Sequence, residues 1–494
     1  MTRHFAVDLG AESGRCIVGT LENGKLTTEE LCRFPTQVCQ LRGEYYWNIF
    51  RYYDEILKGL QTYVQTYGPE LDSIGVDTWG CDYCLLDETG FLKALPKSYR
   101  RMTAQQPYAE MEETFGKFQL YQRHGIQFLD FNTLNQLLWE RAQDAHYFDN
   151  VTGLLFMGDS LHYLLGAPAV CEYSTASISQ LVNTGTQTWD AEILHAFGLP
   201  EAVATKLVFA GDVIGTLSDS IADAVGLRRG VKLVAPAVHD TASASVAVPA
   251  EGQNWASISS GTWSLASVEL DAPVNNAQSY AMNISNSAGV LGKSLFLKNI
   301  MGLWIIQQCK YRWNEADPAL TYSRIVELAE AAEPFYAWID PDDARFFQPG
   351  DMPSRICYYL HASGQRCPEE HDIGQIARIV YESLAMKYRH VFARISAVSG
   401  RRIDALHITG GGSNNRMLDQ FTANAMNVPV IAGPAECSAM GNLLMQAYGC
   451  GALSSLDAIR QVVRDSAVLQ TFQPQNISDW ETAYAAFCNY IPKD

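Results

Sequence analysis

The sequence predicts an α/β protein with two lobes. A strand, a glycine-containing turn and a second strand open the chain, and the same plan recurs from residue 255. A short buried strand after the first helix is typical of strands that a crossover helix returns in parallel. The chain of 494 residues is also long enough for several domains of ~150 residues each. We place the boundary near residue 246, which divides the chain into 1–246 and 247–494.

The first lobe is expected to begin with three antiparallel strands. Residues 5–7 lead into a turn over 8–15, and residues 16–19 resume the extended pattern. Asn23 and Gly24 form a hairpin signal, and a third strand over 26–34 follows them.

The first helix is predicted to begin after Asn48, whose side chain can cap free amides. Residues 72–77 then form a short buried strand that joins the sheet in parallel. One face of the helix is expected to carry Ile49, Tyr53, Ile56, Leu57, Leu60 and Val64.

The second lobe repeats the strand, turn, strand plan over 255–266, with the turn at Ser260, Gly261 and Thr262. A long helix is predicted over 373–398, because its apolar residues keep helical spacing until Gly400. A strand over 402–409 then runs into three glycines, and another helix follows.

Composition excludes several classes of function. With 36 Lys and Arg against 54 Asp and Glu, the net charge is −18, which repels nucleic-acid backbones and anionic membrane surfaces. No apolar run approaches the ~20 residues of a membrane span, and the first residues lack the pattern of a signal peptide. We therefore expect a cytoplasmic protein whose partner is a small molecule, with a monomer as the working expectation.

Two partial motifs are better explained without a special function. Cys81 and Cys84 form a lone C-x-x-C with no second pair or histidine nearby, so a metal or redox role is the minor alternative to a structural one. Residues 289–294 end like a phosphate-binding loop, but Ser287 stands where that motif requires its first glycine. We expect Lys293 in a surface turn.

Three glycine-containing strand ends are candidates for phosphate binding. They are the turn after Asp8, the turn Ser260-Gly261-Thr262, and the triple glycine at 410–412. Glycine lets backbone amides converge on anionic oxygens. One such turn alone is more often an ordinary hairpin, but the three together suggest a nucleotide in a cleft between the lobes.

Asp240 is the strongest catalytic candidate. An apolar strand over 232–235 precedes His239, Asp240 and Thr241, and a helix of small residues is predicted over 242–248. We expect the helix dipole and free amides to favour the ionised form of Asp240. An ionised carboxylate there can accept a proton from an attacking hydroxyl during phosphoryl transfer, and a plain helix cap is the alternative.

A polar and aromatic cluster follows the strand over 72–77. Trp79 could stack on a sugar, and Gly80 could let a ligand hydroxyl approach the backbone. A buried tryptophan in a strand turn is the alternative.

These segments together resemble the FGGY carbohydrate kinases over nearly the whole chain. HDTAS (239–243) with LKNIMGLW (297–304) is the specific pair, and it separates this chain from the family's glycerol and xylulose kinases. The other stretches that carry the resemblance are 6–15, 73–87, 125–137, 180–183, 259–265, 406–412 and 430–436.

The resemblance implies two actin-like, ribonuclease H-like domains, with mixed sheets flanked by helices and the active site in the interdomain cleft. It also implies a phosphotransferase that uses ATP and Mg²⁺ and acts on an alcohol group of a ketose. A kinase for another ketose or polyol is the near alternative, and a non-catalytic actin-like ATPase or sugar sensor is the distant one.

The resemblance also assigns roles to individual residues. Asp240 matches the general base, and Asp8 matches the carboxylate that holds magnesium, through water. Since ATP is an anion, backbone amides, Arg15 and Mg²⁺ must offset the charge of the chain. The matching substrate-binding positions are Gly80, His239, Thr241 and Asn299. The matching ATP-binding positions are Ala11, Glu12, Ser13, Gly14, Arg15, Thr262, Gln307 and Gly411.

Two segments depart from the family pattern. Glu12 stands where many relatives have a small or hydroxyl residue, and we expect its carboxylate to point away from the phosphates. Residues 98–103 replace an expected Tyr-Arg-Asp-x-Arg-Thr run and lose an aspartate near the sugar. The altered Tyr99-Arg100-Arg101 segment leaves the range of ketoses open.

Overall fold

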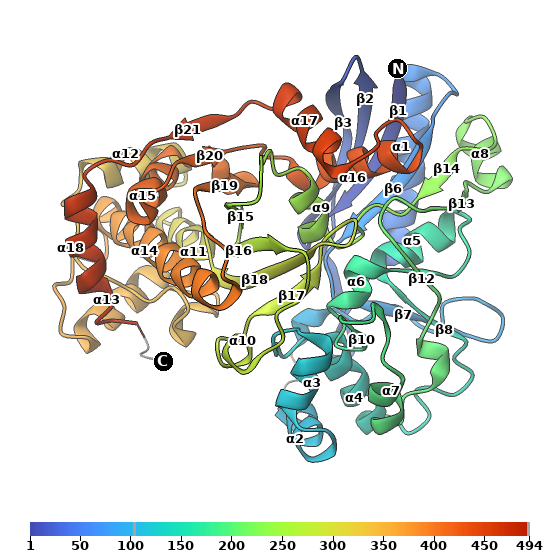
Figure 1. The fold of residues 1–494 in the computed structure, drawn as a ribbon, viewed down its shortest axis with the longest axis horizontal. Helices are drawn as coiled ribbons and strands as arrows, with labels where there is room; N and C mark the ends of the chain where they lie inside the picture. The colour runs from blue at the N-terminus through green and yellow to red at the C-terminus, as the bar shows by residue number, and fades with distance from the viewer. Residues whose placement is uncertain (102–104, 492–494) are drawn as a thin grey trace. The chain divides into compact units, whose positions relative to one another are not determined.

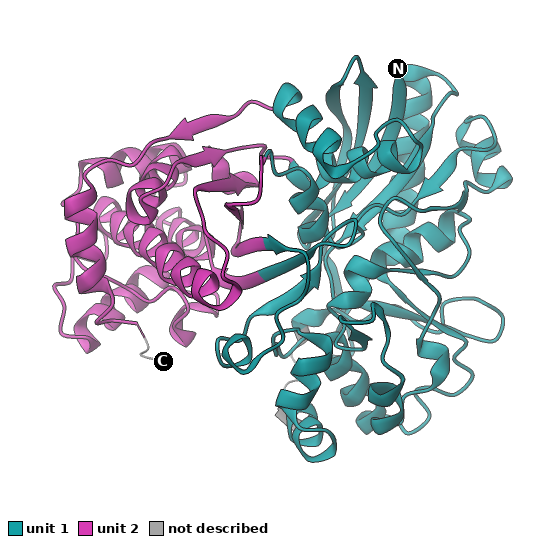
Figure 2. Cartoon of the chain, in the orientation of Figure 1, with its two compact units in different colours: residues 1–249, 269–296, 437–466 teal, residues 250–268, 297–436, 467–494 magenta. Residues whose placement is uncertain are grey.

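The computed structural model describes residues 1–101 and 105–491. The chain separates into two compact units, and each is assembled from three stretches (Figure 2). The first change of unit follows Pro249, and the domain boundary near residue 246 stays a prediction. Unit 1 comprises Met1–Pro249, Glu269–Phe296 and Cys437–Ser466, and unit 2 comprises Ala250–Val268, Leu297–Glu436 and Ala467–Asp494.

Unit 1 is organised around a six-stranded sheet with the order β13-β14-β6-β1-β2-β3 (Figure 1). Its first three strands form the predicted antiparallel meander, and β6 joins β1 in parallel, as expected. The strands are β1 (Thr2–Leu9), β2 (Ser13–Glu22), β3 (Lys25–Pro35), β6 (Ser73–Thr78), β13 (Val213–Thr216) and β14 (Lys232–Val234).

A separate hairpin lies before the first helix, so the prediction of only three strands there is wrong. β4 (Val38–Leu41) and β5 (Glu44–Trp47) pair across a turn in which Arg42 and Gly43 have φ of 53° and 89°. Turns with two positive φ values usually carry Asn or Asp before Gly. Arginine at that position concealed the hairpin signal.

Helix α1 (Ile49–Tyr67) begins where predicted, because the Asn48 side chain accepts a hydrogen bond from the Arg51 amide at 3.1 Å. Three residues of the predicted apolar face, Tyr53, Leu57 and Val64, are only partly buried. The fully buried stripe consists of Ile49, Tyr52, Ile56, Gly59, Leu60 and Tyr63. Gly59 allows this rotation, since a Cβ there would lie 2.7 Å from the Cys16 sulfur.

Helix α16 (Cys437–Gly449) belongs to unit 1 although its residues come late in the chain. Asn442 donates to the Gly75 carbonyl of β6 at 3.2 Å, and Gln446 donates to the Phe5 carbonyl of β1 at 3.1 Å. These bonds fix α16 against the centre of the sheet.

The remaining strands of unit 1 form separate short pairs, and its other helices lie outside the six-stranded sheet. The short strand pairs are β7 (Tyr83–Leu86) with β8 (Gly153–Phe156), β9 (Cys171–Glu172) with β12 (Leu207–Val208), and β10 (Val182–Asn183) with β11 (Thr188–Trp189). The helices are α2 (Gln105–Thr114), α3 (Lys117–His124), α4 (Thr133–Gln143), α5 (Met157–Leu165), α6 (Tyr173–Ser177), α7 (Ala191–Ala196), α8 (Asp219–Val225), α9 (Asp240–Val246), α10 (Ala277–Ala281) and α17 (Leu456–Ser466).

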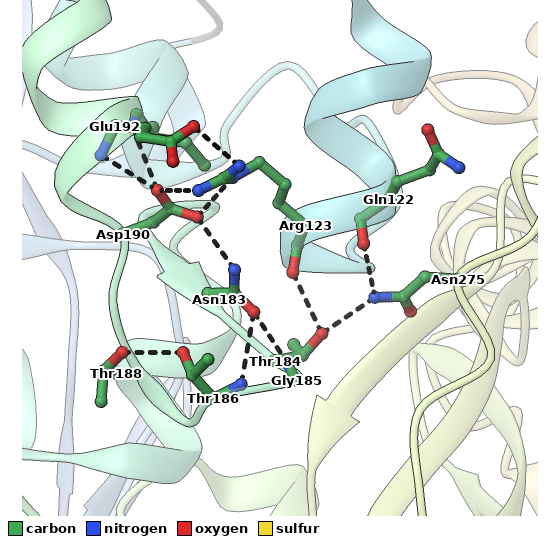
Figure 3. Close-up of polar contacts among 11 residues, drawn as sticks. Gln122, Arg123, Asn183, Thr184, Gly185, Thr186, Thr188, Asp190, Glu192 and Asn275 are labelled. Atoms are coloured by element: carbon green, nitrogen blue, oxygen red, sulfur yellow. Dashed lines mark hydrogen bonds and ion pairs between the residues drawn. The ribbon is translucent and has the colours of Figure 1, made fainter.

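A polar network joins α3, the β10–β11 hairpin and α7 (Figure 3). Arg123 donates to both carboxylate oxygens of Asp190, at 2.6 and 2.9 Å, and Asn183 donates to the same carboxylate at 3.2 Å. Asn275 donates to the Thr184 hydroxyl at 2.9 Å. Although burial raises the pKa of Asp190, the hydrogen bonds from Arg123 and the Ile193 amide lower it below its ordinary value.

The second sheet has the strand order β17-β18-β16-β15-β19-β20-β21. β15 pairs antiparallel with β16, which confirms that the strand, turn, strand plan recurs. β19 lies parallel to β15 and starts three residues later than the predicted 402. The strands are β15 (Trp255–Ser260), β16 (Trp263–Leu270), β17 (Ser285–Ala288), β18 (Ser294–Met301), β19 (Ala405–Thr409), β20 (Val430–Ala432) and β21 (Gln470–Phe472), of which β17 is counted with unit 1.

The long helix α14 (Ile373–Ser399) is confirmed, and Gly400 ends it with φ of 70°. Among the described helices, none combines the length and apolar character needed to cross a bilayer. The other helices of unit 2 are α11 (Trp304–Trp313), α12 (Tyr322–Ala331), α13 (Met352–Ala362), α15 (Arg416–Met426) and α18 (Ile477–Phe487).

Candidate active site

The hairpin between β1 and β2 presents two free backbone amides. Gly10 closes the turn by donating to the Ser13 carbonyl at 3.0 Å. Within the described residues, the amides of Ala11 and Glu12 have no acceptor. Adjacent free amides of this kind suit an anionic oxygen. The Glu12 side chain is exposed, and its orientation away from phosphate stays a prediction.

Packing and an ion pair constrain the residues on either side of this hairpin turn. A Cβ on Gly14 would lie 2.4 Å from Leu9 and 2.6 Å from Phe34, so only glycine fits between them. The guanidinium of Arg15 forms an ion pair with the carboxylate of Asp8. Arg100, in the run that departs from the family, donates to the Ala11 carbonyl at 3.3 Å. Residues 102 and 103 of that run lie outside the described residues.

Three carboxyl groups of unit 1 influence one another. Asp8 and Asp77 are direct partners in the register of the parallel strands β1 and β6. Burial, then the charges of Asp8 and Asp240, raise the pKa of Asp77 well above its ordinary value. Asn442 donates to one Asp77 oxygen at 2.5 Å, and the other oxygen is buried without a partner in the described structure. Burial and the two neighbouring charges therefore favour the protonated form of Asp77.

Helix α9 begins at Asp240, two residues before the predicted 242, so Asp240 lies at the start of a helix as expected. Thr241 donates to Oδ1 of Asp240 at 3.1 Å, and Nε2 of His239 lies 3.7 Å from the same oxygen. Burial lowers the pKa of His239 to about 4. The imidazole is therefore neutral at neutral pH, and its approach to Asp240 is not an ion pair.

The prediction that the helix dipole keeps Asp240 ionised is wrong. Burial, followed by the charge of Asp8, raises the pKa of Asp240 to about 7, against the hydrogen bonds from Thr241. Helix α9 has seven residues, so its dipole is small beside these effects. The Asp240 side chain is still 35% exposed, which leaves one side open to a reactant. A carboxylate that titrates near neutral pH is suited to general base catalysis.

Gly80 lies against His239. A Cβ on Gly80 would stand 3.3 Å from the His239 ring and 2.1 Å from a methyl group of Ile178. The substrate candidates Gly80, His239 and Thr241 are thus neighbours in unit 1.

Trp79 matches the alternative of a buried tryptophan in a strand turn. Its side chain is 6% exposed and packs on Trp47 with ring centroids 4.2 Å apart. Both indoles donate to Asp82, at 3.0 Å from Trp79 and 2.5 Å from Trp47. Trp79 is therefore a core residue and not a surface for stacking a sugar.

Two of the nucleotide candidates in unit 2 contact each other. The Thr262 hydroxyl donates to the Gln307 side chain at 3.3 Å. The Thr262 carbonyl accepts from the amides of Gly302 and Trp304 at 3.1 and 3.2 Å, which fixes the β15–β16 turn to the start of α11. Asn299 is half-buried within β18.

Gly411 lies at the same edge of the second sheet as this turn. Ser259 and Thr409 are register partners, so β15 and β19 end side by side. A Cβ on Gly412 would collide with the Ser260 hydroxyl at 1.9 Å, whereas a Cβ on Gly411 meets nothing within 4 Å. Gly411 therefore borders open space that a ligand can enter.

The donor set suits magnesium held through water. In the described ranges, no group of three or more His, Cys, Asp or Glu side chains is arranged to hold a metal. Mg²⁺ commonly keeps several waters and binds one or two carboxylates together with substrate phosphates. Asp8, next to the hairpin with free amides, fits that pattern.

The C-x-x-C motif has a structural environment. Cys81 and Cys84 are both buried, and burial raises the pKa of Cys84 to about 12 and that of Cys81 further still. Because the thiolate is the reactive and metal-binding form, this environment opposes the metal or redox alternative.

Several residues that shape the site were not found from the sequence. Glu172 and Ser174 bind the backbone next to Asp240, and Ser438 binds Asp8. Each lies far along the chain from its partner. None of the three residues lies in a stretch that carries the family resemblance, and local spacing does not say which distant partner a polar side chain meets.

Comparison with known proteins identifies the family. The N-terminal domain of the FGGY family of carbohydrate kinases matches residues 4–247, and the C-terminal domain of that family matches residues 256–450. The chain belongs to the FGGY family of carbohydrate kinases. It is a sugar kinase, a phosphotransferase, and the family implies ATP as the co-substrate.

Two relatives match nearly end to end. The chain is 42% identical to the rhamnulokinase of Bacteroides thetaiotaomicron over 488 residues, which cover 99% of both chains. It is 37% identical to the rhamnulokinase of Enterococcus faecalis, with 98% of this chain and 97% of the relative covered. HDTAS and LKNIMGLW separate this chain from the family's glycerol and xylulose kinases, and these matches to rhamnulokinases confirm that separation.

Solved structures confirm the fold class. A ligand-bound xylulose kinase from Lactobacillus acidophilus has a TM-score of 0.81 at 15% identity, covering 99% of this chain and 97% of the other. A glycerol kinase from Plasmodium falciparum, solved with ADP, has a TM-score of 0.76 at 12% identity, covering 100% and 99%. The chain has the two-domain fold of these kinases, with mixed α/β sheets flanked by helices.

Proposed function

We propose that this protein phosphorylates L-rhamnulose with ATP to give L-rhamnulose 1-phosphate, a step of rhamnose catabolism in the cytoplasm. The observation that carries the proposal is the 42% identity, over 99% of both chains, to a rhamnulokinase. A monomer stays the working expectation.

In the proposed reaction, the primary hydroxyl of the ketose attacks the γ-phosphorus of ATP. Its oxygen forms the new bond to phosphorus, the bond to the ADP oxygen breaks, and Asp240 accepts the hydroxyl proton. Thr241 and His239 both lie at Oδ1 of Asp240, which leaves Oδ2 to receive that proton. Gly80, His239, Thr241 and Asn299 are the proposed contacts of the ketose.

Backbone amides and side chains are proposed to bind ATP. The hairpin Ala11–Arg15, with the free amides of Ala11 and Glu12, is assigned to the phosphates. Thr262 and Gln307, which bond to each other, and the unobstructed Gly411 are assigned to the rest of the nucleotide. Mg²⁺, when bound, neutralises charge on the phosphate oxygens, and Asp8 is the residue proposed to hold it through water.

A coupled ADP-release assay over a panel of ketoses tests this proposal. The expected result is turnover with L-rhamnulose well above the rate of ATP hydrolysis in water alone. L-fuculose and L-xylulose represent the alternative substrates, and glycerol represents another branch of the family. If L-rhamnulose gives no stimulation above the water-only rate, the substrate assignment is wrong.

A further inference from the structure

A buried carboxylate outside the predicted site holds the backbone that leads into Asp240. Glu172 is 1% exposed and lies directly before α6. Its Oε1 accepts from the Ser174 amide at 2.9 Å, which is an ordinary helix cap. Its Oε2 does not cap the helix. It accepts hydrogen bonds from the Val238 amide at 3.0 Å and from the Ser174 hydroxyl. Capping therefore explains only one of the two oxygens.

Ser174 continues this connection toward the catalytic candidate. Its hydroxyl donates to Glu172 and accepts from the amide of His239 at 3.1 Å. The two amides before Asp240 are thus held by one carboxylate and one hydroxyl. On the other side, the Val238 carbonyl accepts from the Thr78 amide at 2.8 Å.

Packing and a further hydrogen bond also constrain the backbone of Val238 and His239. Val238 is fully buried, and a Cβ on Gly158 would stand 2.5 Å from its side chain. The His239 carbonyl accepts from the Ser243 amide at 2.9 Å, inside α9. The position of Asp240 therefore depends directly on the groups that hold Val238 and His239.

We propose that Glu172 is a positioning residue for the phosphoryl transfer, and that it acts through Ser174 and the Val238 amide to hold Asp240 in place for proton acceptance. This inference rests on the proposed role of Asp240. A general base contributes only from the correct position, and a displacement of about 1 Å can lower a rate by about a hundredfold.

The test compares Glu172→Gln, Ser174→Ala and the double variant with the wild type, using whichever ketose the wild type phosphorylates best. Glutamine has one acceptor oxygen, so it cannot satisfy both the Ser174 amide and the Val238 amide. We expect each single variant to lower kcat about tenfold or more, with KM for ATP within about twofold. Because the two residues act as a unit, the double variant should lose about as much as the worse single variant.

Glu382→Gln is the matched control. Glu382 is also fully buried, accepts a backbone hydrogen bond from Phe335 at 2.8 Å, and has its pKa raised to about 7 by burial. We expect this variant to lose stability but to keep kcat per folded molecule. If Glu172→Gln does not fold, Ser174→Ala alone still decides, since it removes the bond to the His239 amide.

Asp240→Asn, measured in the same series, separates the possible failures. Wild-type kcat in Asp240→Asn overturns both the base assignment and this inference. A loss in Asp240→Asn with near-wild-type kcat in Glu172→Gln and Ser174→Ala overturns this inference alone, as does a multiplicative loss in the double variant. Activity with a ketose other than L-rhamnulose overturns only the substrate assignment.

Discussion

The hydroxyl of Ser438 donates a hydrogen bond to the Asp8 carboxylate at 2.9 Å, across 430 positions of sequence. The same oxygen of Asp8 is ion-paired with Arg15. Helix α16 thus helps to fix the carboxylate that we assign to magnesium, together with the hairpin that we assign to the phosphates. A residue from the last seventh of the chain therefore binds the carboxylate beside the hairpin that we propose for the phosphates.

The first prediction concerns the catalytic base. Asp240→Asn is nearly isosteric and removes the only group proposed to accept the proton, so kcat should fall about a hundredfold or more. ATP binding, measured by calorimetry, and the melting temperature should stay near those of the wild type. Near-wild-type turnover by purified protein would show that Asp240 is not the base.

The second prediction concerns pH. Because the pKa of Asp240 is raised to about 7, the group is protonated and unable to accept a proton at lower pH. The value of kcat/KM for the ketose should therefore rise with pH through about 7 and then level off. A pH profile of kcat/KM checks this. A rate that is flat between pH 5 and 8 would contradict it, because an ordinary aspartate is already ionised throughout that range.

The third prediction separates two adjacent glycines. Gly411→Ala places its Cβ in open space, so the melting temperature should not change while KM for ATP rises several-fold. Gly412→Ala collides with Ser260 and should lower the melting temperature. Thermal unfolding and ATP titration of both variants check this pair. An unchanged KM in Gly411→Ala would remove Gly411 from the nucleotide site.

The fourth prediction concerns acid stability. The pKa of Asp190 is lowered in the folded state, so its ion pair with Arg123 stabilises the fold above the unfolded pKa near 4, and this stabilisation is lost as pH falls further. Asp190→Asn should lower the free energy of unfolding by about 2 kcal/mol at neutral pH. The difference from the wild type should shrink toward pH 3. Urea unfolding at both pH values measures it.

Asp223→Asn is the control for this stability prediction. Asp223 also pairs with an arginine, Arg229, but both side chains are more than half exposed, at 57% and 59%. Exposed pairs contribute little, so this variant should unfold like the wild type. Equal losses from the two variants would mean that the network of Figure 3 has no special role in stability.

The sequence predicts the ends of helices well where a single capping or helix-ending residue determines them. Asn48 caps α1 and Gly400 ends α14 as predicted, because caps and stops depend on one residue and its immediate neighbours. The β4–β5 hairpin was missed because Arg42 adopts a positive φ that favours other residues.

The ionisation of Asp240 could not be predicted from local sequence in the same way. The sequence places Asp240 at a helix start, and the dipole argument favours its ionised form. The raised pKa comes instead from burial and from Asp8, which is brought near by folding over long distances. The roles of Glu172 and Ser174 depend on the same kind of contact, which no local spacing encodes.

The division of unit 1 into three stretches has a consequence for its biosynthesis. Helix α16 packs on β1 and β6 through Asn442 and Gln446, yet residues 250–436 must be made between the bulk of unit 1 and that helix. At typical rates of ~5–20 residues per second, a ribosome needs roughly 10 to 40 seconds for that span. During this interval the growing chain carries that face of its first sheet without the helix that packs on it in the folded unit.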